Sequence, residues 1–181
     1  MKQFFAFFIL VVSLTNCDST TTSTENNVAQ DEPSGSTFVE AAAVNQAVLD
    51  AYQSLHFTEG NDPDYEAIRR IFMEDAVFIS FRGDSLDKVN LNEFIAGFQD
   101  AVLSGQVRSF QEAELFGRTE GFGKIAHRIS TYGTYVNHPD SLVERGINSF
   151  QLVKLEEGWK VHSVIWDVEK KGQPIPEWYL E

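Results

Sequence analysis

The chain has 181 residues and a formal net charge of −13, from 27 acidic residues against 14 Lys and Arg. A protein this acidic is repelled by phosphate backbones, so nucleic-acid binding is disfavoured, and it avoids an anionic membrane surface unless it is tethered there. Hydrophobic residues make up 43% of the sequence and include 15 Phe, enough for one folded domain with a sizeable core.

The first residues have the pattern of a secretory signal. Lys2 supplies a positive charge, a mainly apolar run covers residues 4–14, and Cys17, the single cysteine, comes directly before a polar stretch. A charged start, a short apolar core and a processing site are typical of a signal that is removed. The apolar run covers only about half of the ~30 Å hydrocarbon core of a bilayer, so a membrane-spanning helix is disfavoured.

The residues that end this signal resemble the lipobox of bacterial lipoproteins: Leu14-Thr15-Asn16-Cys17. Asn16 departs from the family pattern, in which Gly, Ala or Ser usually precedes the cysteine. The resemblance implies that residues 1–16 are removed and that Cys17 carries two or three acyl chains such as palmitate. These chains would anchor the protein to a membrane of the bacterial cell envelope, in a leaflet that stays open. An ordinary cleaved signal is the alternative, but no A-x-A pattern occurs nearby.

A polar tether is predicted over residues 17–37. After Cys17 this segment contains only Val28 and Ala29 as apolar members, apart from one proline and one glycine. So little apolar surface cannot offset the entropy of ordering, and we expect disorder here. Twenty flexible residues reach roughly 25 Å, so the segment would separate an anchor from a folded domain.

Helix signals dominate the first half of the folded part. Apolar residues recur at three- and four-residue steps over residues 39–55, which predicts an amphipathic helix. Asp62-Pro63 predicts an N-cap followed by proline at the first helical position. A third helix is predicted to begin near Asn90, with Glu93 completing a capping box, and to end at Gly105.

Strand signals dominate the second half. A short apolar strand is predicted at residues 77–81, before a turn at Gly83-Asp84. Four longer extended segments follow, at residues 107–116, 124–136, 143–155 and 159–168. Long consecutive strands with short loops indicate an antiparallel sheet. The predicted class is α+β, with the helices on one face of the sheet.

This order of elements resembles the nuclear-transport-factor-2-like superfamily, a group that includes the SnoaL-like polyketide cyclases and ketosteroid isomerase. Within it, the local sequence is similar to the SnoaL-like subgroup. The similar segments are residues 72–78, 126–132, 145–152, 158–161 and 165–169. The resemblance covers residues 38–170 and leaves 171–181 as a C-terminal tail. It implies a cone: three N-terminal helices pack on a strongly curved, mainly antiparallel sheet, with a pocket in the mouth. It also implies a possible homodimer through the outer face of the sheet.

Strong catalytic motifs do not occur in the sequence. There is no Gly-rich phosphate loop, no G-x-S-x-G, no H-E-x-x-H and no paired Cys, so we expect neither a cofactor nor a metal. The four histidines, His56, His127, His138 and His162, do not share a local element at ligand spacing. A zinc site from His127, His162 and Asp167 would need two strands to converge, and ordinary hydrogen-bonded histidines are favoured over it.

Polar residues on the predicted strands are the candidates for lining the pocket: His127, Tyr132, Asn148, Gln151 and Trp166. A few polar groups among apolar ones are typical of a pocket wall. The same composition fits a sheet that simply packs on helices. Strand alternation places His127 and Tyr132 on opposite faces, and parity alone does not settle which face points inward.

Three functions remain open from the sequence. The leading one is a membrane-tethered domain that binds a small, partly apolar ligand. The second is a cofactor-independent proton-transfer enzyme, of isomerase or cyclase type, with Asp167 as base and Tyr132 or Tyr135 as donor. A dehydratase type would use His127 and His162 with Tyr132. The third is a structural envelope lipoprotein whose own aromatic side chains fill the pocket.

Overall fold

The computed structural model describes residues 36–82 and 85–181. The predicted signal (residues 1–16), Cys17 and all but the last two residues of the predicted tether (17–37) lie outside the described residues. None of the described helices is long and apolar enough to cross a membrane.

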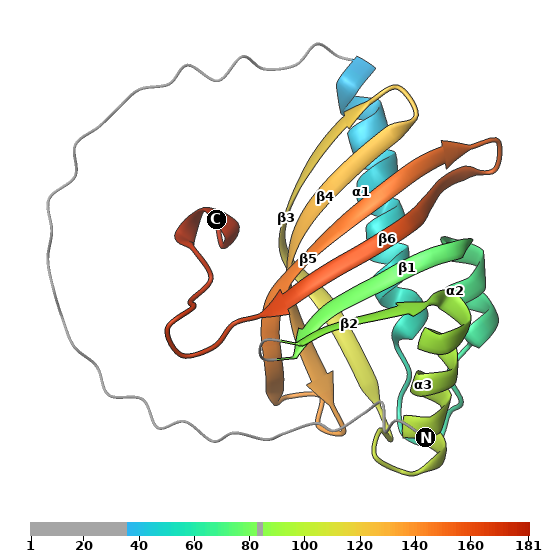
Figure 1. The fold of residues 1–181 in the computed structure, drawn as a ribbon, viewed down its shortest axis with the longest axis vertical. Helices are drawn as coiled ribbons and strands as arrows, with labels where there is room; N and C mark the ends of the chain where they lie inside the picture. The colour runs from blue at the N-terminus through green and yellow to red at the C-terminus, as the bar shows by residue number, and fades with distance from the viewer. Residues whose placement is uncertain (1–35, 83–84) are drawn as a thin grey trace, which may run out of the picture.

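Within these residues the chain forms three α-helices, one short 3-10 helix and six strands that make one sheet (Figure 1). The helices are α1 (Ser36–Leu55), α2 (Tyr65–Ile71), α3 (Leu91–Leu103) and η1 (Glu177–Tyr179). The strands are β1 (Phe72–Arg82), β2 (Ser85–Asn90), β3 (Phe110–Phe122), β4 (Ile125–Val136), β5 (Leu142–Leu155) and β6 (Gly158–Val168). The predicted α+β class is confirmed.

The strand order is β2-β1-β6-β5-β4-β3. Only β1 and β6 pair in parallel, and every other neighbouring pair is antiparallel. Figure 1 shows the sheet twisting around α1, which runs behind it, while α2 and α3 lie beside β1 and β2. The concave face is therefore covered by helices, and the core lies between them and the sheet.

Capping explains where two helices begin. The predicted capping box of α3 is confirmed, since Asn90 Oδ1 accepts from the Glu93 backbone N–H and Glu93 Oε2 accepts from that of Asn90. The predicted cap of α2 was wrong by two residues. Asp64 caps this helix in place of Asp62, because the Asp64 carboxylate accepts from the backbone N–H of Ala67 at 3.0 Å.

The structure also extends the predicted sheet. β1 begins at Phe72, five residues before the predicted strand, and β2 was not predicted. Residues 117–122, which lie between two of the predicted strands, continue β3 into a long hairpin with β4. Small, polar and apolar residues are mixed in this part of β3, so the local sequence does not indicate a strand. The segment is extended because it pairs with the neighbouring strand.

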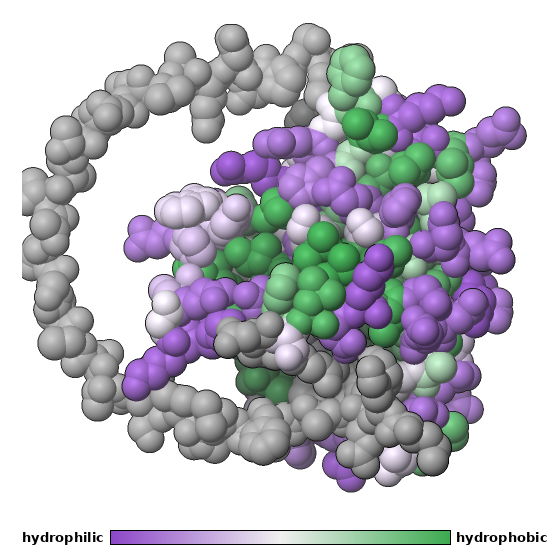
Figure 2. Space-filling model, in the orientation of Figure 1, coloured by the Kyte–Doolittle hydropathy of each residue, from purple (hydrophilic) through white to green (hydrophobic). Residues whose placement is uncertain are grey.

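The C-terminal tail packs on the face of the sheet opposite α1. The Thr131 hydroxyl donates to the backbone carbonyl of Tyr179 at 2.5 Å, and the Ile175 side chain is buried. Figure 2 shows this side of the molecule, where apolar side chains gather over the middle of the sheet within a hydrophilic surround. Trp178 and Ile165 are among its large apolar residues that remain exposed.

Truncating Leu152 tests the inner face of β5. Leu152 is 1% exposed, whereas Leu155, at the end of the same strand, is 38% exposed. We predict that Leu152→Ala lowers the free energy of unfolding by about 2–5 kcal/mol, because a buried cavity is left behind. The matched Leu155→Ala control costs less than about 1 kcal/mol. Urea denaturation measures both, and equal losses would contradict the orientation of this strand.

Candidate functional site

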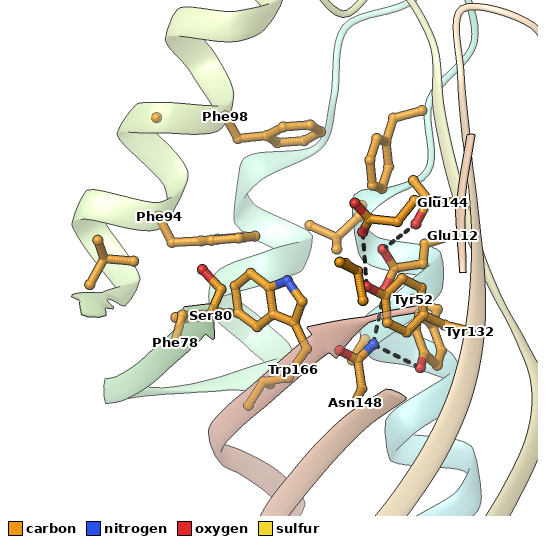
Figure 3. A pocket seen from close by; sticks show the side chains of 18 of the residues that line it. Tyr52, Phe78, Ser80, Phe94, Phe98, Glu112, Tyr132, Glu144, Asn148 and Trp166 are labelled. Atoms are coloured by element: carbon orange, nitrogen blue, oxygen red, sulfur yellow. Dashed lines mark hydrogen bonds between the residues drawn. The ribbon is translucent and has the colours of Figure 1, made fainter. Parts of the chain in front are cut away.

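A cavity of about 390 Å³ lies between the concave face of the sheet, the end of α1 and one side of α3. Its lining is mainly apolar and includes ten aromatic residues. Figure 3 shows two unlike walls that face each other across this space. The labelled aromatic rings of α3, β1 and β6 form one wall, and polar side chains of β3, β4 and β5 form the other.

The aromatic wall is held by ring packing. Phe78 of β1 and Phe94 of α3 stack with centroids 4.2 Å apart and planes within 4° of each other. Phe98, one turn further along α3, meets Phe110 edge to face at 5.6 Å. Trp166 of β6 pairs in the sheet with Ser80 of β1, so both side chains lie on the concave face. These contacts leave aromatic surface directed at the cavity.

The polar wall follows from strand register. Glu112, Thr134 and Glu144 are direct cross-strand partners on β3, β4 and β5, so their side chains form one row on the concave face. Glu112 accepts a hydrogen bond from the Thr134 hydroxyl at 3.0 Å and another from the Asn148 amide at 3.1 Å. The Tyr132 hydroxyl donates to Glu144 at 2.9 Å.

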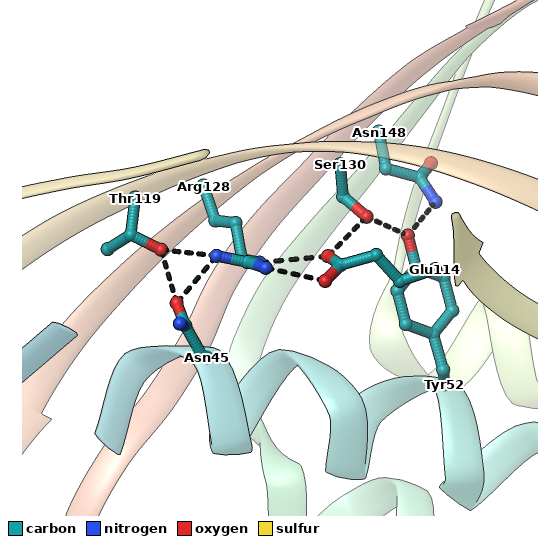
Figure 4. Close-up of polar contacts among 7 residues, drawn as sticks. All are labelled: Asn45, Tyr52, Glu114, Thr119, Arg128, Ser130 and Asn148. Carbon is teal, nitrogen blue, oxygen red and sulfur yellow. Dashed lines mark hydrogen bonds and ion pairs between the residues drawn. The ribbon is translucent and has the colours of Figure 1, made fainter. Parts of the chain in front are cut away.

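A second polar row lies deeper, between the sheet and α1 (Figure 4). Arg128 donates two hydrogen bonds to Glu114, at 2.5 and 2.8 Å, and both side chains are at least 90% buried. Arg128 also donates to Asn45 of α1 at 2.5 Å. The space for its guanidinium exists because Gly117 has no side chain, and a Cβ there would collide with Arg128.

Tyr52 joins this deeper row to the cavity. The Ser130 hydroxyl donates to Glu114 at 2.7 Å, so the Tyr52 hydroxyl donates to Ser130 at 2.6 Å. The Asn148 amide donates to the Tyr52 oxygen at 3.1 Å and also to Glu112. One chain of hydrogen bonds thus runs from the ion pair to the carboxylate in the cavity wall.

Burial sets the protonation of this wall. Desolvation raises the pKa of Glu112 to about 7, although the hydrogen bonds from Thr134 and Asn148 act in the opposite direction and the charge of Glu144 adds to the rise. Burial also raises the pKa of Tyr52 and of Tyr132 well above the ordinary tyrosine value, so both hydroxyls keep their protons. Glu112 is therefore a carboxyl group that exchanges its proton near neutral pH.

Solved structures of other proteins share this architecture. An NTF2-like protein of unknown function from Silicibacter pomeroyi has a TM-score of 0.53 and 20% identity, over 74% of this chain and 98% of its own. A candidate dehydratase of the NTF2-like family from Streptomyces avermitilis has a TM-score of 0.54 and 14% identity, over 74% and 98%. The chain has the NTF2-like fold.

A protein of unknown function with a cystatin-like fold from Nostoc punctiforme is similar to this NTF2-like domain as well, with a TM-score of 0.57 and 14% identity over 72% of this chain and 92% of its own. No family model and no curated protein matches the chain. At these identities the likeness concerns the fold, and the function has to be argued from the site.

The NTF2-like domain brings three of the five sequence-predicted site residues into the cavity lining: Tyr132, Asn148 and Trp166. The other two, His127 and Gln151, are cross-strand partners on the opposite face of the sheet. His127 Nε2 lies 3.0 Å from the Ser149 hydroxyl, and Gln151 is exposed. Strand alternation separates them from Tyr132, and they are not part of the candidate site.

The other residues considered as catalytic from the sequence also lie outside the cavity. Asp167, considered as a base, accepts from the Val168 backbone at 2.8 Å and from Gln173 at 2.9 Å, and Lys170 is 3.7 Å away. These contacts lower its pKa and leave it ionised, led by the hydrogen bond from Gln173. Tyr135 and His162 do not line the cavity. No three His, Cys, Asp or Glu side chains within residues 36–82 and 85–181 come together as a metal site.

Sequence reasoning missed Glu112 and Glu144. The signal for Glu112 was present, since Phe110, Glu112 and Glu114 alternate along one strand and must share a face. Two carboxylates on the same face as an aromatic residue indicate either a solvated edge or a buried polar site. Only the pairing with β4 decides between these, because it turns that face toward α1.

The titration of Glu112 tests the electrostatics of the wall. We predict a midpoint near pH 7 for its side-chain carbon in NMR, because burial favours the neutral form. The native state then holds a proton that the unfolded state releases near its ordinary value, so the stability contributed by Glu112 falls as pH rises from about 4.5 to about 7. Glu112→Gln removes this loss, which is at most about 3 kcal/mol.

Glu120→Gln is the matched control, since Glu120 is exposed on the same strand. This control keeps the wild-type pH dependence of stability. A Glu112 midpoint in the ordinary range of glutamate would contradict its desolvation in the cavity wall.

Proposed function

We propose that this NTF2-like domain binds a small, partly apolar molecule in the cavity. The observation that carries the proposal is the cavity itself: about 390 Å³ lined mainly by aromatic and aliphatic side chains, with hydrogen-bonding groups gathered on one wall. Apolar lining supplies affinity and a few fixed polar groups supply orientation, which is the usual construction of a small-molecule site. The polar groups are pre-organised here because each is held by a neighbour on another strand.

The size of the cavity favours a ligand over a purely structural role. In a structural lipoprotein the aromatic side chains would fill this space themselves, because well-packed interiors leave few voids larger than a water molecule. Here Phe78 and Phe94 stack on each other and leave the cavity open, while Trp166 lines it from the strand next to that of Phe78.

Proton-transfer catalysis is the second candidate function, and Glu112 favours it. A carboxyl group whose pKa is about 7, in an apolar cavity, has the properties of a general base or acid at neutral pH. In this reading Glu112 takes the role that the sequence gave to Asp167. Glu112→Gln separates the two functions, because an enzyme loses turnover whereas a binding protein still holds an uncharged ligand.

We also propose that Cys17 is lipidated and that the domain is held at a bacterial membrane. The support is the signal-like pattern of residues 1–16 and the acidic composition, which gives the domain no attraction of its own to an anionic surface.

Filling the cavity tests the main proposal. We predict that the uncharged fluorescent probe N-phenyl-1-naphthylamine binds the wild-type domain saturably with one site. Ser80→Phe places a ring in the cavity and weakens binding by roughly tenfold or more, because the apolar volume is then occupied. Fluorescence titration measures both affinities.

Ser163→Phe is the matched control, since Ser163 lies on β6 and is not part of the cavity lining. This control keeps the wild-type affinity. Absence of saturable binding, or an equal loss in both variants, would overturn the proposed pocket.

Expression in a bacterial host tests the anchor. We predict that the mature wild-type protein has Cys17 as its first residue, carries the mass of two or three acyl chains, and partitions into detergent. Cys17→Ser abolishes the added mass. Intact-mass spectrometry decides the question, and a free thiol on a chain that still carries residues 1–16 would contradict the anchor.

A further inference from the structure

The charged residues in the described lining of the cavity are acidic: Asp87, Glu93, Glu112 and Glu144. No Lys, Arg or His is among the described residues of the lining. A site with this composition repels carboxylates, phosphates and sulfates, and it attracts positive charge. The composition therefore limits the chemistry of any ligand beyond its apolar body.

Glu112 and its neighbour Glu114 have different hydrogen-bond partners. Glu114 lies two residues further along β3 on the same face, and Arg128 meets its charge through two hydrogen bonds. Glu112 receives only neutral donors, the Thr134 hydroxyl and the Asn148 amide. Within the described part of the chain no cationic side chain forms an ion pair with Glu112. Glu112 is half-buried, and a partly desolvated carboxylate that receives only neutral donors from the described residues is destabilised as an anion, so an incoming cation would stabilise it.

The wall opposite Glu112 suits a cation as well. Phe94 and Trp166 lie across the cavity from the carboxylate (Figure 3). The faces of aromatic rings carry partial negative charge, which attracts ammonium groups, with Trp the strongest. An organic cation in this space meets a carboxylate on one side and aromatic rings on the other.

We propose that the ligand of this cavity is an organic ammonium ion, a protonated primary amine on a compact apolar or aromatic body. The inference rests on the proposed binding function and names the class of molecule. The ammonium group donates to the Glu112 carboxylate, and the apolar body occupies the aromatic part of the cavity. Asn148 and Thr134 hold the carboxylate in place from the other side.

Proton linkage follows from this arrangement. Bound ammonium favours the ionised form of Glu112, so binding releases the proton that the carboxyl group holds below its pKa of about 7. The affinity for the amine therefore rises with pH between about 5.5 and about 8, while the amine itself stays protonated. The affinity for an uncharged ligand of the same shape does not rise.

Three matched compounds test the proposal: 1-naphthylmethylamine, 1-naphthylmethanol and 1-naphthoate. Each competes with N-phenyl-1-naphthylamine for the wild-type domain, for Glu112→Gln and for the control Glu120→Gln. We expect the wild-type domain to bind the amine roughly tenfold or more tightly than the alcohol near pH 8, and the carboxylate more weakly than either. Glu112→Gln brings the amine and the alcohol within about threefold of each other, and Glu120→Gln keeps the wild-type preference.

Equal affinities for the amine and the alcohol in the wild-type domain would overturn this inference while leaving the binding proposal intact. A preference that persists in Glu112→Gln would also overturn it. Failure of all three compounds and of the fluorescent probe would overturn the proposed function itself, so the two failures are distinguishable. Circular dichroism of each variant confirms that a lost preference does not come from unfolding.

Discussion

The buried ion pair between Arg128 and Glu114 holds α1 against the sheet. It sits between α1 and the sheet, where breaking such a pair by removing one partner costs about 3–5 kcal/mol. Arg128 also reaches Asn45, and the same chain of hydrogen bonds continues through Ser130 to Tyr52, two turns further along α1. Asn45 and Tyr52, at the two ends of this chain of hydrogen bonds, both belong to α1. These polar contacts therefore fix the position of α1 along the concave face of the sheet.

The cavity is a consequence of that fixed position. With α1 held against one half of the sheet, the other half curves away and is closed by α3, whose Phe94 stacks on Phe78. The polar row ends at Glu112, which has no cationic partner among the described residues, whereas Glu114 has Arg128. The same strand thus contributes a structural carboxylate and, two residues away, a carboxylate available to a ligand.

Local signals gave the class, the order of most elements and the capping box of α3, because these depend on periodicity and on contacts a few residues apart. The extension of β1 to Phe72 and the existence of β2 depend on pairing between strands, which no local pattern contains. The site was predictable in part: alternation alone separates Tyr132 from His127. Glu112 could not be assigned, because the same Phe-x-Glu-x-Glu alternation fits an exposed edge until β4 turns it inward. That no described cationic side chain pairs with it is a property of the assembled site.

A crystal structure of the domain with 1-naphthylmethylamine would show whether Glu112 receives the ammonium group. We expect the naphthyl ring inside the cavity between Trp166 and the polar wall, with the amine nitrogen about 3 Å from a carboxylate oxygen of Glu112. The side chains of Asn148 and Thr134 keep their hydrogen bonds to that carboxylate. An amine that lies outside the cavity, or inside it with the nitrogen turned away from Glu112, would contradict the account.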